Sequence, residues 1–114
     1  MKLVDKNISN SELKEMAEKM HGDMVKAVVD LGQEIMVVDS ELHADEEDYL
    51  LEHGSKQENL WGINIYPDKS DSENWIEFDS MINLRPAQNN RSRGVDNPEI
   101  RAKIQKIVEK LVNL

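Results

Sequence analysis

The chain has 114 residues, enough for one compact domain and too few for two. Acidic residues outnumber basic ones by 23 to 14, and the net charge of −9 disfavours binding to nucleic acid or to anionic membranes. The absence of cysteine excludes disulfides, thiol nucleophiles, iron–sulfur clusters and cysteine-based zinc sites. Because no stretch is typical of a signal peptide or a transmembrane segment, we expect a soluble cytoplasmic protein.

The first half of the chain predicts a helix, a strand and a second helix. Ser9 is typical of a helix cap, with Glu12 three residues later, and apolar residues then recur at every third or fourth position. This spacing predicts one long amphipathic helix that ends near Gly32. The β-branched run over residues 34–39 predicts a buried strand, and residues 44–52 predict a short helix.

The second half of the chain predicts a hairpin and a last helix. Apolar and polar residues alternate over 60–67 and again over 75–85, so we expect two paired strands with one apolar face. A polar loop follows, and Asn97 and Pro98 are typical of a helix start. The sequence therefore predicts a single α+β domain over residues 1–114, with a small three-stranded, mainly antiparallel sheet and three helices in the order αβαββα.

Four short strings of the chain are distinctive: residues 41–46 (Glu-Leu-His-Ala-Asp-Glu), 60–67 (Leu-Trp-Gly-Ile-Asn-Ile-Tyr-Pro), 82–86 (Ile-Asn-Leu-Arg-Pro) and 90–93 (Asn-Arg-Ser-Arg). They resemble an uncharacterised family of short bacterial and archaeal proteins, classed as a domain of unknown function. The resemblance extends from about the middle of the first helix to the C-terminus. It implies a single domain, and it implies no activity, cofactor or substrate.

A cluster of carboxylates and a histidine is the first candidate site. If the first strand continues beyond residue 39, Asp39, Glu41 and His43 lie on one face of it. Glu77 and Asp79 share a strand face in the same way. If the two strands are neighbours, Glu41, His43 and Asp79 converge as ligands for Mg²⁺, Mn²⁺ or Zn²⁺, which could activate water. The alternative is a solvated sheet surface on which the charges stay apart.

A basic segment near the C-terminus is the second candidate site. Residues 1–84 carry a net charge of −13, whereas residues 85–114 carry +4 and contain every arginine of the chain. Arginine forks with asparagine and serine donors suit the recognition of phosphate or carboxylate. The predicted ligand-binding residues are Arg85, Asn90, Arg91, Arg93 and Arg101. The alternative is that these arginines pair with the acidic half of the same chain.

The leading interpretation is a noncatalytic module that uses the arginine segment to bind an anionic small molecule or a partner protein, with no cofactor. The first alternative is a divalent-metal-dependent hydrolase or nuclease that uses the histidine and carboxylate cluster. A structural subunit of a larger assembly is the second alternative. Nucleic acid is not an expected partner because few aromatic residues are present for base stacking. Tyr66, Trp75 and Met81 lie opposite the predicted core, and this pattern favours either a homodimer or a covering helix.

Overall fold

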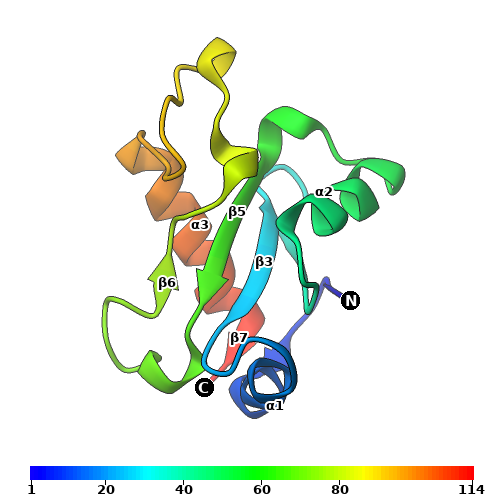
Figure 1. Ribbon diagram of the computed structural model, residues 1–114, viewed down its shortest axis with the longest axis vertical. Helices are drawn as coiled ribbons and strands as arrows, with labels where there is room; N and C mark the ends of the chain where they lie inside the picture. The colour runs from blue at the N-terminus through cyan, green and yellow to red at the C-terminus, as the bar shows by residue number, and fades with distance from the viewer.

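A five-stranded antiparallel sheet forms the centre of the computed structural model, which describes residues 1–114 (Figure 1). The strands lie in the order β1-β4-β3-β5-β6, so β3 is central and pairs with β4 and β5. Two further strands, β2 and β7, form a separate parallel pair. The helices are α1 (Asn10–Met20), α2 (His43–Glu52) and α3 (Pro98–Leu111). The strands are β1 (Lys2–Val4), β2 (Ile8–Ser9), β3 (Val25–Asp30), β4 (Ile35–Val38), β5 (Leu60–Ile65), β6 (Ile76–Glu77) and β7 (Val112–Asn113).

The prediction of an α+β domain with three helices is confirmed, whereas the prediction of a three-stranded sheet is wrong. The predicted long first helix ends at Met20, and its expected second half is the central strand β3. Gly22 separates the two elements in a left-handed conformation with φ +94°, which glycine adopts without strain. Because both faces of β3 are covered along most of its length, its sequence lacks the alternation that marks a half-exposed strand. None of the helices has the length and apolar character that crossing a membrane requires.

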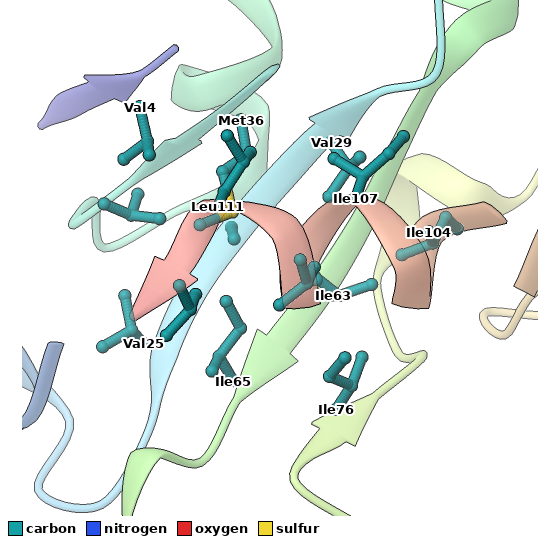
Figure 2. Close-up of a cluster of buried hydrophobic side chains, with 14 of the residues drawn as sticks. Val4, Val25, Val29, Met36, Ile63, Ile65, Ile76, Ile104, Ile107 and Leu111 are labelled. Atoms are coloured by element: carbon teal, nitrogen blue, oxygen red, sulfur yellow. The ribbon is translucent and has the colours of Figure 1, made fainter. Parts of the chain in front are cut away.

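One face of the sheet packs against α3 and forms the main core (Figure 2). The helix begins as predicted, because the Asn97 side chain accepts a hydrogen bond from the Glu99 amide and Pro98 occupies the first turn. Apolar residues at three- and four-residue spacing then face the sheet, namely Ile104, Ile107, Val108 and Leu111. They contact strand residues such as Val29, Met36 and Ile63, all fully buried. The sheet surface under α3 is therefore filled by apolar side chains.

The opposite face of the sheet is covered only in part, by α2. Figure 1 shows α2 to one side of β3, while no α-helix lies in front of β5 and only the short 3-10 helix Met81–Asn83 approaches one end of this strand. Under α2 the sheet is apolar, and a second small core forms there from Val28, Val37, Leu50 and Leu60. Beyond α2 the same face is polar, because Lys26, Asn64 and Glu77 occupy paired positions on β3, β5 and β6. Polar side chains thus occupy the part of the face that no helix covers.

The predicted strand over residues 75–85 is reduced to the two residues of β6. After β6 the chain crosses the edge of the sheet, so that Phe78 packs against the main core and Ile82 against the small core under α2. Side chains expected on one face therefore lie on opposite faces. Trp75, predicted on an exposed face, is only 3% exposed within the main core, and it is not available for a dimer contact.

Side chains replace the missing strand along the outer edge of β5. The Asn83 amide donates to the Gly62 carbonyl oxygen at 3.0 Å and accepts from the Gly62 N–H at 2.9 Å, as a neighbouring strand would. The Arg85 guanidinium donates to the Leu60 carbonyl oxygen. Because these contacts satisfy the backbone of β5, residues 78–85 have no need to continue as a strand.

We predict that Gly62→Ala destabilises the fold by about 1–3 kcal/mol through overpacking. An added methyl group would lie 2.6 Å from both Cβ and Oγ of Ser80, and Ser80 is buried. Urea denaturation measures the loss. The substitution should be less costly in a Ser80→Gly background, because that change removes both contacting atoms. An equal loss in the two backgrounds would contradict this explanation.

Candidate functional site

A cavity of about 180 Å³ lies where the start of α2 meets residues 80–82, on the partly covered face of the sheet. We call it the α2 cavity. Its polar lining consists of Lys26, His43, Ser80 and Arg93. His43 belongs to the predicted metal cluster and Arg93 to the predicted arginine site. The fold thus brings together one residue from each candidate site, together with a lysine that neither of them included.

Lys26 comes from β3, where it pairs with Asn64 of β5. The lysine is half-buried because the strand places it on a sheet face beside the start of α2. Its ammonium group forms none of the ion pairs in the molecule, which all involve other residues. Because no carboxylate of the protein pairs with this ammonium group, it is available to an anion.

His43 is the first residue of α2 and is buried against β5. Its Nε2 lies 2.8 Å from the carbonyl oxygen of Ile63. Because a carbonyl oxygen only accepts, Nε2 carries the proton, and in the neutral ring Nδ1 carries the lone pair. Burial lowers the pKa of His43, although the bond to Ile63 partly opposes this effect. The ring is therefore neutral at pH 7, and it adds polarity but no charge to the cavity.

Arg93 supplies the second cation of the cavity. Its Nε donates to a carboxylate oxygen of Asp79 at 2.7 Å, and the two side chains are 55% and 43% exposed. The backbone carbonyl of Arg93 accepts from the Ser80 N–H at 2.9 Å and from the Asn83 side chain at 3.0 Å, which fixes the segment against residues 80–83. Since the bond to Asp79 uses Nε alone, the two terminal amino groups of the guanidinium are available to a ligand.

A family model matches residues 2–111, and its description is Protein of unknown function (DUF5674). The chain belongs to the DUF5674 family. The expected resemblance to an uncharacterised family is confirmed, and the match begins nearer the N-terminus than the distinctive strings suggested. No curated protein and no solved structure matches the chain. The family match therefore assigns no chemistry to the residues of this DUF5674 protein.

Arg85, the first residue of the predicted arginine site, has a structural role in the DUF5674 chain. Its guanidinium lies over the ring of Trp61, 4.2 Å from the ring centre, and donates to the backbone carbonyls of Gln57 and Leu60. Burial lowers the pKa of Arg85, and the nearby carboxylate of Glu47 opposes the shift. The Arg85 guanidinium thus connects the loop before β5 to the segment that follows residue 83.

The other residues of the predicted arginine site do not converge on one ligand site. Asn90 is buried, and its side-chain amide donates to carbonyls of its own loop, including that of Asn83 at 2.7 Å. Arg101 donates to the carbonyl of Val95 and so connects α3 to the preceding loop. The Arg91 side chain makes no hydrogen bond or ion pair, and it is exposed. Of the five predicted residues, only Arg93 lies at the α2 cavity.

The predicted metal ligands do not come together in the DUF5674 chain. No group of three or more histidine and carboxylate side chains is placed to hold a metal ion. Glu41 is exposed in the turn before α2, and the Asp79 carboxylate is held by Arg93. His43 uses Nε2 on the backbone of β5. The geometry thus gives the metal-dependent interpretation no support.

Sequence reasoning missed Lys26 because it assigned this residue to the polar face of a long helix. The signal was present in residues 25–30, Val-Lys-Ala-Val-Val-Asp, where three β-branched valines favour a strand. If residues 25–30 are interpreted as a central strand, Lys26 is a charged residue in a strand where apolar residues are expected. A charged residue at such a position is a candidate ligand-binding residue.

Proposed function

We propose that this DUF5674 protein is a noncatalytic binding protein for a small anionic ligand, and that the ligand occupies the α2 cavity. The observation that carries the proposal is Lys26, a half-buried lysine whose ammonium group forms no ion pair within the protein and which shares the cavity with Arg93. Both cations come from parts of the fold with fixed backbones, β3 and the segment tied to residues 80–83. Two preorganised cations suit a carboxylate or a phosphate.

The size of the cavity limits the ligand. Sites for cofactors and drug-sized ligands usually occupy about 300–1,000 Å³. The α2 cavity, at about 180 Å³, is smaller. It therefore suits a compact anion and not a whole nucleotide. The net charge of −9 repels anions at long range, so attraction depends on the two local cations.

Titration of the protein with inorganic phosphate and with acetate, followed by backbone amide NMR shifts, tests the proposal. We expect saturable shifts at residues 26, 43–44 and 93. Lys26→Met and Arg93→Gln should each weaken binding about 10- to 100-fold, because hydrogen bonds to charged groups contribute about 1.5–3 kcal/mol. Arg91→Gln is the matched control, because it removes the same charge from the same loop at a side chain without contacts.

Two results would contradict the proposal: no saturable shift with any anion, or equal weakening in Arg91→Gln, which would indicate a nonspecific charge effect. Titrations with Mg²⁺, Mn²⁺ and Zn²⁺ test the metal-dependent alternative in parallel. Saturable metal binding that is lost in His43→Ala would favour that alternative over the anion site.

A further inference from the structure

We infer that the ligand of the α2 cavity is a small amphiphilic anion, in which a single carboxylate or phosphate group carries an alkyl or aryl group. The inference rests on the proposed anion site and adds the class of ligand. The evidence for this class of ligand is a pair of exposed apolar side chains, one from each wall of the cavity. Leu42 precedes α2 and is 57% exposed, and Met81 begins the segment opposite and is 62% exposed.

These two residues are unusual among the exposed side chains of the molecule. Apart from the chain ends, five large hydrophobic residues are exposed, and two of the five line this one cavity. Ala44 and Ile82 continue the apolar surface into the cavity. Single exposed apolar residues are normal on a protein surface, whereas a pair facing a charged cavity is typical of a binding site.

The position of Leu42 is not explained by the stability of α2. Leu42 is the N-cap residue, with the extended backbone (φ −130°, ψ 133°) of a capping position, and no side-chain cap is formed. Serine, threonine, aspartate or asparagine would satisfy the first amides of the helix at this position, and leucine does not. An apolar residue here weakens the helix start and enlarges the apolar rim of the cavity.

The charges and the rim together define the ligand. Lys26, from the sheet, and Arg93 both line the cavity, so the anionic group is expected between these two cations. Leu42 and Met81 then contact the apolar part as it leaves the cavity. The volume of about 180 Å³ suits a small molecule with one charged group, and the apolar rim adds affinity that a bare inorganic anion cannot use.

The test is a calorimetric titration with acetate, butyrate and hexanoate, and with phosphate and phenyl phosphate. We expect affinity to rise at least tenfold from acetate to hexanoate, because each fully buried methylene contributes up to about fourfold. Phenyl phosphate should likewise bind more tightly than phosphate. The head group that binds more tightly at similar apolar area is the class of anion that the cavity prefers.

The double variant Leu42→Ser with Met81→Gln should bind acetate within about twofold of the original protein and lose the increase along the series. Loss of folding is not a concern, since both side chains are exposed and serine is a favourable cap for α2. Leu51→Ser with Met20→Gln is the matched control, because it removes two exposed apolar residues outside the cavity.

The outcomes separate the two proposals. If acetate and phosphate bind but longer chains add nothing, the amphiphilic ligand is overturned and the anion site stands. If the control pair abolishes the increase as well, the gain is nonspecific and the inference is also overturned. If no anion binds, both proposals fail.

Discussion

Replacing Glu46 by methionine is expected to raise the free energy of unfolding by about 3 kcal/mol at pH 7. Glu46 lies in the first turn of α2, is fully buried against the sheet, and has no hydrogen-bond partner for either carboxyl oxygen. Burial raises its pKa to about 10, while the nearby backbone amide of Ser40 and the charge of Lys26 only partly oppose the shift. The folded protein therefore holds Glu46 in its neutral form at pH 7.

The direction of the pH dependence follows from proton binding. The ordinary pKa of a glutamate is 4.5, so above that pH the unfolded chain releases a proton that the folded chain keeps. The stability contributed by this group is thus fully present below pH 4.5 and is lost progressively as the pH rises toward about 10. Between pH 4.5 and pH 7 the loss amounts to about 1.36 kcal/mol for each pH unit, or about 3 kcal/mol.

Urea denaturation of the Glu46→Met variant at pH 4.5 and at pH 7 measures the effect. The stabilisation should shrink to less than about 1 kcal/mol at pH 4.5, since the glutamate is then neutral in the folded state and only half ionised in the unfolded state. Glu15→Met is the control, because it removes one negative charge from an exposed position on α1. It should change stability by no more than about 0.5 kcal/mol at either pH. A gain of equal size at both pH values would contradict a buried, protonated Glu46.

The fold could be predicted where local signals agree with the tertiary structure. The starts of α1 and α3 carry capping residues, Ser9 and Asn97, and both side chains form the expected bonds. The strand β5 alternates because α3 covers only one of its faces with apolar residues. The spacing of apolar residues up to Leu31, by contrast, fits either a long helix or a short helix followed by a buried strand. Gly22 and the β-branched residues that follow it are the signals that favour the second structure.

The candidate site was predicted in part for a related reason. His43 and Arg93 were selected by residue type and spacing, and the fold does place both at one cavity. Lys26 could not be found without knowing that β3 is a strand. Arg85 and Asn90 look like ligand-binding residues in the sequence, but their donors are used on backbone carbonyls. Composition cannot distinguish these two uses of a polar side chain, because both require the same hydrogen-bond donors.

Hydrogen bonds from side chains to the backbone of β5 explain why the last strand of the sheet, β6, needs only two residues. An unpaired strand edge exposes N–H and carbonyl groups that invite association with other chains. In this protein the edge of β5 is closed by Asn83 and Arg85, which come from a segment without regular strand structure. The same segment, through Ser80 and Met81, forms one wall of the α2 cavity. Its attachment to β5 therefore sets both the stability of the edge and the shape of the cavity.

Replacing Asn83 by leucine is accordingly expected to destabilise the protein by about 3–5 kcal/mol. The Asn83 side chain is fully buried and forms three hydrogen bonds, two with the backbone of Gly62 and one with the carbonyl of Arg93. Leucine has a similar size, so the loss would come from backbone groups left without partners, each of which costs about 1–3 kcal/mol.

Urea denaturation followed by far-UV circular dichroism measures the loss for Asn83→Leu and for Asn83→Asp. Aspartate keeps the bond from the Gly62 N–H but places a carboxylate against two carbonyl oxygens, so it should destabilise the fold as well. Asn74→Leu is the control, because Asn74 is exposed and its side chain forms no hydrogen bond. A cost below about 1 kcal/mol for Asn83→Leu, within the range of surface substitutions, would show that the edge of β5 does not depend on this amide. A cost of about 3–5 kcal/mol would support the role of this amide in holding the segment whose residues 80–82 line the α2 cavity.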